Sequence, residues 1–527
     1  MLRIAALSAA AVLASAAVAG PLHAQSVRLP DPSPTRSASS EAFTLDRMVE
    51  FGLQSSYRVR QLRLDVERRR SLLNAERARL KSRVQLELNT PEVESITETR
   101  WNSTLQRDEL VAQNTRRIEM DFSVRQPVVL LGYPTNGVFS FNNRVYRYTQ
   151  IDGIEADTQY YNRYFFAYDQ PLFQPNRMKN SLERAQLNLE DSELAYQADI
   201  INMIDGMAED YYDLLELAYR REVAARRVDQ LGIAIGVAQA RATVEEGSDI
   251  EVEQLLVEQA NAIEDLNQTA SRLRLQEADV KQRLQLPAGL DLTISPELDV
   301  VAVAVDELEA VELARSLAPR MRRLQIDVRE TEIGLDETRG QNAFRMNVGV
   351  TYGREMQDPR LQGLWAEPRN SYTVDVRATV PIIDWGERRL RIEAQRYSLQ
   401  RAELAVDQAE AEIDTRVRSE VRNLRDFLQR ATNMEANLDM ARRLTETTQE
   451  RYAAREVGLV ELMQALDRER LTAENFLGAY LGYQEALLDL RQLTFFDFES
   501  NLPVADRFPI CVATGGDSDR ASSCGGG

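Results

Sequence analysis

Histidine is almost missing from this sequence. Of its 527 residues one is histidine, His23. It lies in a segment that we expect to be cleaved, so the remaining chain would have no histidine. That excludes Ser-His and Cys-His nucleophilic catalysis and histidine-based metal sites. Carboxylate chemistry stays open in principle, but the 83 acidic residues mark out no pair. We therefore expect neither an enzyme nor a cofactor or metal site.

Cysteines and long apolar runs are also scarce. The two cysteines, Cys511 and Cys524, lie in a Gly/Ser/Asp-rich tail. Either they pair into a small disulfide loop or the tail has no structural task. Beyond the N-terminus no apolar run reaches the 18 residues or so that a transmembrane helix needs. The net charge of −19 argues against a nucleic-acid partner.

The N-terminus has the pattern of a secretory signal peptide, residues 1–24. Arg3 is followed by an apolar core from Ile4 to Ala19 and by a cleavage site at Leu22-His23-Ala24. A membrane anchor is the alternative, but the apolar run is too short to span a bilayer. No cysteine lies near the cleavage site, so a lipid anchor is not indicated.

Alternating apolar and polar residues predict strands around residues 345–380. From Ser371 to Val380 every second residue is apolar, which is typical of a strand with one apolar and one wet face. Pro381 ends this strand because proline has no N–H to donate. Similar alternation at residues 83–89 and 163–169 predicts two further strands, and Pro171 follows the second of these.

Landmarks recur at a nearly constant offset and predict an internal duplication. Pro171 and Pro381 are 210 positions apart, and Gly247 and Gly458 are 211 apart. We expect two structural repeats, residues 44–286 and 306–496. A flexible leader (25–43), a linker with some strand character (287–305) and a C-terminal tail (497–527) complete the chain.

Each repeat should run helix, strand, strand, long helix, shorter helix. The long helices are expected at about 176–245 and 387–455, each spanning roughly 100 Å at about 1.5 Å per residue. The shorter ones should end near Leu286 and Leu493. The first repeat carries about 52 extra residues within 90–158, an insertion that we interpret as a long loop with an extra hairpin. Whether that hairpin adds strands to the sheet is left open here.

About four strands per chain are too few to close a barrel, and an open edge cannot face lipid. We expect an α+β protein in which several copies close a shared barrel in an outer membrane. The residues expected to face lipid are Tyr164, Phe166, Tyr168, Tyr372, Val374 and Val376. Those expected to face a water-filled lumen are Gln85, Glu87, Arg163, Asp375 and Arg377.

The chain resembles the TolC-like outer-membrane efflux proteins over about residues 44–496. The residues that carry the resemblance are Pro171-Leu172-Phe173-Gln174, Pro381-Ile382-Ile383-Asp384-Trp385-Gly386, Arg388-Arg389, Arg451-Tyr452, Val457-Gly458-Leu459-Val460, Leu466-Asp467 and Leu471. Pro171, Pro381, Asp384 and Gly386 would form the strand-to-helix turns. The resemblance implies a homotrimer with a barrel of four strands per protomer and a long α-helical tunnel across the periplasm of a Gram-negative bacterium.

The resemblance also implies partners and a gate. Members are exit ducts of tripartite efflux pumps or type I secretion systems, and they dock an inner-membrane transporter through a periplasmic adaptor. Asp467 falls on one of the family's two acidic gate positions, whereas the other is Gln464 here. Glu253, six residues after Gly247, is the equivalent of Gln464 in the first repeat. The turns after Gly247 and at Gly458-Leu459 would contact the adaptor.

Two other classes remain. A soluble periplasmic coiled-coil scaffold fits the helices and the signal peptide equally well but fits the half-apolar strands poorly. A periplasmic hydrolase is disfavoured by the lack of histidine. Within the duct interpretation, drugs, metal ions and polypeptides all stay open as cargo.

Overall fold

The computed structural model describes residues 43–507, except 153–154, 243–248, 287–288, 291 and 342. The chain divides into two units, residues 1–42 and 43–527, and all described residues belong to the second. The predicted signal peptide, Gly247 and both cysteines therefore lie outside the described residues.

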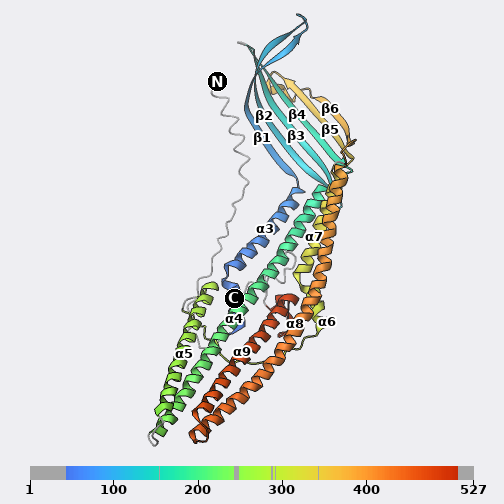
Figure 1. Cartoon of the computed structure of the whole chain (residues 1–527). Coiled ribbons are helices and arrows are strands. Elements are labelled where there is room, and N and C mark those ends of the chain that lie inside the picture. Colours follow the sequence, from blue (N-terminus) through green and yellow to red (C-terminus); the bar gives the residue numbers. More distant parts are fainter. Residues whose placement is uncertain are drawn as a thin grey trace. The chain divides into compact units, whose positions relative to one another are not determined.

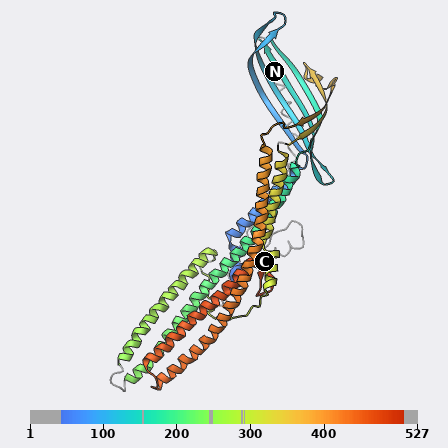
Figure 2. The same cartoon turned by 45° about the vertical axis from the view of Figure 1, so that its right-hand side comes forward.

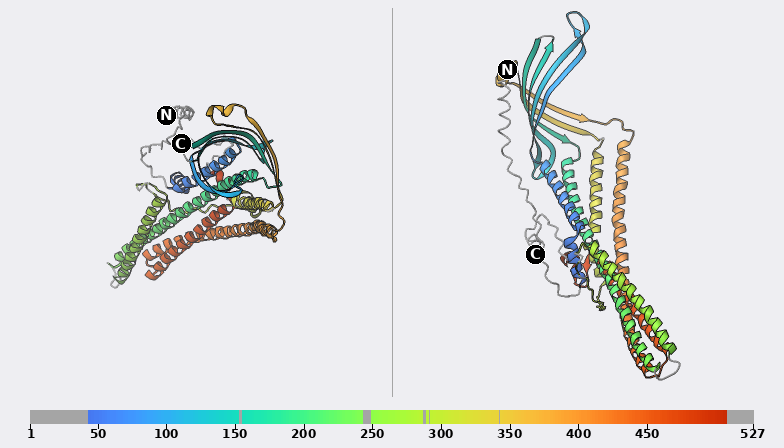
Figure 3. Two further views of the ribbon diagram at one scale, coloured as in Figure 1. Left: turned by 90° about the horizontal axis from the view of Figure 1, so that it is seen from above. Right: turned by 90° about the vertical axis from the view of Figure 1, so that its left-hand side faces the viewer.

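Six antiparallel strands form one curved sheet (Figure 1), in which each strand pairs with the next along the chain. They are β1 (Arg83–Asn102), β2 (Arg107–Leu130), β3 (Tyr133–Asp152), β4 (Glu155–Leu172), β5 (Arg345–Asp358) and β6 (Arg369–Thr379). Figures 2 and 3 show how strongly this sheet curves.

The sheet has six strands where about four were expected, and residues 90–158, expected as a long loop with an extra hairpin, are mostly strand. That segment completes β1, forms β2 and β3 and begins β4. The alternation at residues 118–124 continues the pattern of β1, and Met120 pairs with Leu88. Ile118, Met120, Phe122 and Val124 of β2 share one face, and they pair in register with the same face of β1 and β3.

The register gives the sheet one apolar and one polar face. One row across all six strands contains Val84, Val124, Phe141, Phe166, Tyr352 and Tyr372. A row on the opposite face contains Glu87, Asp121, Arg144, Arg163, Glu355 and Arg369. We call these the apolar face and the polar face. The two residue sets that the sequence assigns to opposite faces do lie on opposite faces.

The helices occur in the predicted order. Helices α2 (Leu45–Ser55) and α3 (Tyr57–Arg79) precede the first four strands, and α4 (Arg177–Ala242) and α5 (Asp249–Arg283) follow them. Helices α6 (Glu307–Leu317) and α7 (Pro319–Gly340) precede β5 and β6, and α8 (Glu387–Ala453) and α9 (Leu459–Thr494) follow them. The first repeat begins with two helices where one was expected, because Ser56 ends α2 and accepts a hydrogen bond from the Arg58 N–H as the N-cap of α3.

The helices pack side by side. In the part of the bundle next to the sheet, the helices lie side by side in the order α3, α4, α7, α8. Further from the sheet the order is α5, α4, α9, α8. Along α8, Ile413, Val417, Val421 and Leu424 form a buried row against α6 and α9. Another core joins α2 and α3 to α4, α5 and α9. Among the described residues no helix is both long and apolar enough to cross a membrane.

Two segments differ from expectation. The described part of 287–305 contains no strand. Residues 496–507, at the start of the expected tail, fold back as β7 (Phe496–Asp497), β8 (Leu502–Pro503) and α10 (Val504–Arg507). Val504 is fully buried, and Arg507 pairs with Asp46 of α2 at 2.7 Å.

Candidate functional site at the helix tips and the strand ends

The predicted gate residues come together where α5 and α9 begin. A cavity of about 650 Å3 is lined by the first turns of both helices. Its lining includes Glu253 from α5 and Leu459, Gln464 and Asp467 from α9. The floor is apolar, because Leu255 and Leu459 belong to a buried cluster that joins α4, α5, α8 and α9. Residues more than 200 positions apart in the sequence therefore line one cavity, which has acidic side chains and an apolar floor.

Asp467 is not an isolated acid. Its carboxylate accepts a hydrogen bond of 2.7 Å from Arg227 of α4, and Glu258 lies 3.9 Å from the same guanidinium. The Asp467 side chain is 56% exposed, whereas that of Arg227 is only 15% exposed. One cation therefore offsets part of the negative charge of the cavity. Nothing in the local sequence indicated Arg227, since it lies 240 positions from Asp467.

A second link ties the end of α8 to the start of α5. Tyr452 is 1% exposed, and its hydroxyl donates a hydrogen bond of 3.2 Å to Glu251. The guanidinium of Arg241 lies 4.1 Å from the centroid of the Tyr452 ring. Burial raises the pKa of Tyr452, and the Glu251 carboxylate raises it further. The neutral phenol therefore remains the donor at all ordinary pH values.

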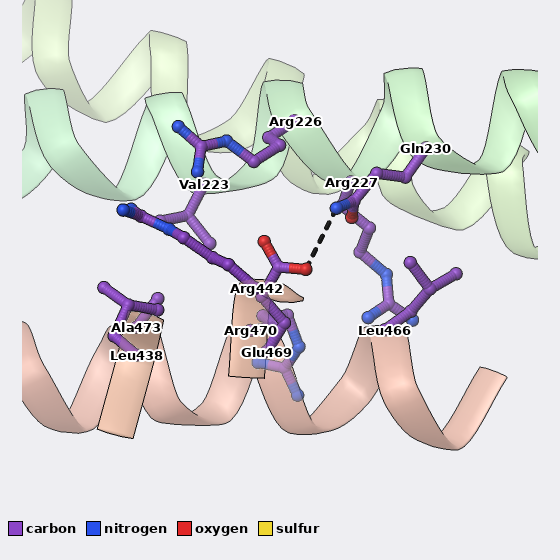
Figure 4. Close-up of a pocket in the computed structure, with 10 residues that line it drawn as sticks. All are labelled: Val223, Arg226, Arg227, Gln230, Leu438, Arg442, Leu466, Glu469, Arg470 and Ala473. Carbon is purple, nitrogen blue, oxygen red and sulfur yellow. Dashed lines mark hydrogen bonds between the residues drawn. The ribbon is translucent and has the colours of Figure 1, made fainter. Parts of the chain in front are cut away.

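A small polar cluster lies one to two turns further from the tips, between α4, α8 and α9 (Figure 4). Glu469, 6% exposed, accepts a hydrogen bond of 3.0 Å from Gln230. Four arginines line the same cavity of about 20 Å3: Arg226, Arg227, Arg442 and Arg470. Most of them reach acids outside the cavity; Arg470, for instance, pairs with Glu474 at 2.6 Å. The polar contacts that join helices here are Gln230 with Glu469 and Arg227 with Asp467, both between α4 and α9.

The turn before α9 does not depend on glycine geometry. Gly458 is the N-cap of α9 with φ −89°, and a Cβ there would meet open space. Its N–H donates to Glu461, three residues into the helix. The left-handed residue that ends α8 is instead Arg455, with φ 66°. The predicted adaptor-contact residue Leu459 is 7% exposed, whereas its neighbour Val460 is 69% exposed.

The two segments predicted as strand-to-helix turns differ in geometry. Asp384 accepts hydrogen bonds from the backbone N–H groups of Gly386 and Arg388, which caps α8. Gly386 has φ 83°, so this turn needs glycine. Pro381 follows β6, as expected. Pro171 still pairs with Asn347 inside β4, and the chain turns only afterwards, at Phe173.

Exposed apolar residues mark the helices that continue the two edge strands. Leu390, Tyr397 and Leu404 of α8 are 55%, 61% and 65% exposed. Tyr57, Leu64 and Leu72 of α3 are 61%, 69% and 49% exposed. Spacings of seven or eight residues place each set on one helix face. We call them the α8 stripe and the α3 stripe. Trp385, at the start of α8, is 93% exposed and so has no core role within one chain.

Comparisons with known proteins agree with this architecture. Residues 310–494 match the model of the family described as outer membrane efflux protein. A comparison with curated protein sequences returned no match.

Solved structures of bacterial membrane channels share the fold. CusC, whose structures describe transmembrane channel formation, aligns with a TM-score of 0.62 and 12% identity over 89% of this chain and 97% of its own. VceC of Vibrio cholerae, an outer membrane protein, aligns with a TM-score of 0.60 and 11% identity over 86% of this chain and 96% of its own. The MtrE outer membrane channel of Neisseria gonorrhoeae, in its open state, aligns with a TM-score of 0.59 and 15% identity over 87% of this chain and 93% of its own. The resemblance to the TolC-like outer-membrane efflux proteins is thus confirmed, by the family model over residues 310–494 and by the fold over most of the chain.

Proposed function

We propose that this protein is the outer-membrane exit duct of a tripartite efflux pump or a type I secretion system. Three copies would close one barrel in the outer membrane of a Gram-negative bacterium and continue it as an α-helical tunnel in the periplasm. The observation that carries the proposal is the sheet, which has a face with an apolar row across all six strands and two edges without a partner. Among the described residues, β1 pairs only with β2 and β6 only with β5.

The edges of the sheet favour closure by further copies of the same chain. Unpaired backbone groups cannot face lipid, because nothing there can hydrogen-bond with them. An even number of antiparallel strands leaves β1 and β6 running in opposite directions, so β6 of one copy can continue the antiparallel ladder onto β1 of the next. At 11 residues β6 has the length that a tilted transmembrane strand needs, roughly 9–11 residues.

The two stripes favour the same arrangement in the helices. α3 leads into β1 and α8 follows β6, so joining the strand edges brings α8 of one copy beside α3 of the next. Leu72, Leu64 and Tyr57 lie 11, 19 and 26 residues before Arg83, where β1 begins. Leu390, Tyr397 and Leu404 lie 11, 18 and 25 residues after Thr379, where β6 ends. The stripes would therefore meet at matching heights and leave the solvent together.

Planar-bilayer recording tests the proposal. Purified protein should produce stepwise increases in conductance, since the barrel lumen is filled with water. A preparation that sediments as a trimer in detergent yet never conducts, under acidic, neutral or high-salt conditions, would contradict the proposal.

At the helix tips we infer a gate and a docking site. Symmetry would bring three copies of Asp467 close together at the tunnel mouth, with Glu253 and Gln464 in the same cavity. The exposed apolar residues around the α9 turn would contact the adaptor. Replacing residues 459–462 should abolish export in cells while the trimer persists; loss of the trimer would instead show that these residues serve packing.

We also infer that the two halves arose by duplication. α4 and α8 have 66 and 67 residues, and α5 and α9 have 35 and 36. Each pair is preceded by two helices and at least two strands. Among the described residues the second half has no counterparts of β2 and β3, so these two strands are the addition to the first half.

A further inference from the structure

The added hairpin of β2 and β3 is a regular part of the sheet. β2 pairs with β1 from Arg107 to Arg125, and β3 pairs with β4 from Val138 to Asp152. Between them the pairing runs from Asn114 opposite Ile151 to Leu130 opposite Tyr133, with one register shift. Removing the two strands would leave β1 and β4 without partners at facing edges. The hairpin is therefore inserted within the sheet and does not merely project from it.

Both faces of the sheet continue across the hairpin. On the apolar face Phe122 contacts Phe141 at 6.3 Å between ring centroids, and Phe141 contacts Phe166 of β4 at 5.0 Å. On the polar face Arg144 lies 2.9 Å from Asp121 and 3.0 Å from Glu119. A strand that presents apolar residues to one side and ion pairs to the other suits a barrel wall between lipid and water.

We propose that the β2–β3 hairpin widens the shared barrel, so that its outer exit admits polypeptide cargo with secondary structure. The proposal rests on the trimeric duct of the proposed function. Six strands from each of three copies make eighteen, against twelve with four strands per copy. With strands about 4.8 Å apart and tilted by about 40°, the diameter between backbones rises from roughly 24 Å to roughly 36 Å.

The width bears on the class of cargo. Side chains on the polar face narrow a barrel by roughly 5 Å on each side, which leaves about 14 Å in the smaller barrel and about 26 Å in the larger. A helix with its side chains is about 10–12 Å across. Two helices or a small hairpin of polypeptide would pass the larger exit together, whereas a drug-sized solute needs no such widening. The polar face carries acidic residues paired with arginines, so a polypeptide would not meet a barrier of charges of one sign.

Disulfide trapping tests which strand closes the barrel. In a background with Cys511→Ser and Cys524→Ser, Leu86→Cys in β1 is combined in turn with Tyr372→Cys, Val374→Cys and Val376→Cys in β6. Within one chain these strands are separated by four others, too far for a disulfide, whose Cα atoms lie about 4.4–6.8 Å apart. One of the three pairs should convert most of the protein to a covalent trimer under oxidation. Glu87→Cys with Val374→Cys, on opposite faces, is the matched control and should stay monomeric.

The contradicting result is equally specific. If the hairpin stands outside the barrel wall, β1 closes directly onto β4, and Leu86→Cys should form a disulfide within one chain with Tyr164→Cys or Phe166→Cys in β4; in the six-stranded sheet β2 and β3 keep these positions too far apart to link. A trimer in which none of the β1 pairs links would also overturn the proposal. Absence of any trimer would instead refute the proposed function, so the two failures are distinguishable.

Polymer exclusion measures the width itself. Neutral polyethylene glycols are added to the side of a planar bilayer that faces the sheet, and their entry is read from the change in conductance. Polymers about 20 Å in hydrodynamic diameter should enter. Exclusion of everything larger than about 12 Å would overturn the widened exit.

Discussion

Asp205 of α4 and Arg491 of α9 form the most deeply buried ion pair of those described. The guanidinium donates to one carboxylate oxygen of Asp205 at 2.6 and 3.1 Å, and both side chains are less than a tenth exposed. The other carboxylate oxygen is buried without a hydrogen-bond partner. Replacing Arg491 by Met should destabilise the protein by about 3–5 kcal/mol, because a buried carboxylate is left unpaired.

Chemical denaturation in detergent checks this value. The double variant Asp205→Leu with Arg491→Met should regain most of the loss, since it removes both charges from the interior. A double variant as unstable as the single one would show that the arginine acts through its packing, not its charge.

The same pair predicts a pH dependence. Burial raises the pKa of Asp205 to about 6, and Arg491 only partly opposes this. The folded protein keeps the proton up to about pH 6, whereas an unfolded aspartate releases it near pH 4. The contribution of Asp205 to the free energy of unfolding should therefore fall as the pH rises from about 4 to about 6. The melting temperature of the wild-type protein, measured relative to that of Asp205→Asn, should fall as the pH rises through that window. A difference in melting temperature that stays constant with pH would contradict the raised pKa.

Two glycines at helix starts give opposite expectations. Gly386 has a left-handed backbone, so Gly386→Ala should cost about 1 kcal/mol through strain alone, because a Cβ there meets nothing within 4 Å. Gly458 has an ordinary backbone and equally open space, so Gly458→Ala is the matched control with little or no cost. Equal effects of the two substitutions would contradict this assignment of the strained turn.

Asp467 and Arg227 should have opposite effects on a conducting channel. Asp467→Ala removes negative charge from the tunnel mouth and should weaken cation selectivity and block by divalent cations. Arg227→Ala frees the Asp467 carboxylate from its partner and should strengthen both. Selectivity and block that stay unchanged in both variants would show that Asp467 is an ordinary exposed helix residue.

At the scale of the elements, the long helices were predictable because each carries a continuous apolar stripe. α8 begins at Glu387 as expected, and α4 and α8 end within about three residues of their predicted ends. The added hairpin was not predictable as part of the sheet. Alternation at residues 118–124 indicates a strand but not its partner, which lies in β1 and β3. The break at Ser56 was missed for a similar reason, since the apolar pattern continues across it.

Side-chain partners were the least predictable feature of the site. The spacing of Gln464 and Asp467 from Gly458 placed both on the first turns of α9, and the cavity contains both. The cation that faces Asp467 comes from α4, and only the packing of α4 against α9 brings it there.

The α8 stripe gives the prediction for assembly. Tyr397→Lys should weaken the trimer without unfolding the chain, because Tyr397 is 61% exposed within one copy but would be covered by α3 of the next. Leu275→Lys in α5, at a site that is 72% exposed and outside both stripes, is the matched control. Sedimentation in detergent should show monomers for the first variant and trimers for the second. Trimers of normal stability in both would exclude the stripe from the interface.

At the scale of the whole molecule, the sheet and the helices both indicate further copies of this chain as the partner. A sheet with one apolar face and two unpaired edges is unstable alone in lipid, and the two stripes are unusually exposed for a chain in water. A second and third copy remove both problems at once. A periplasmic scaffold would have to cover the apolar face with its own helices, but the helices lead away from the sheet (Figure 1).

The most direct test of this account is where the untagged protein sediments when cell membranes are separated. The account predicts recovery in the outer-membrane fraction, as a trimer that dissociates on heating in detergent. Recovery as a soluble periplasmic protein would contradict the shared barrel, and the scaffold interpretation would take its place.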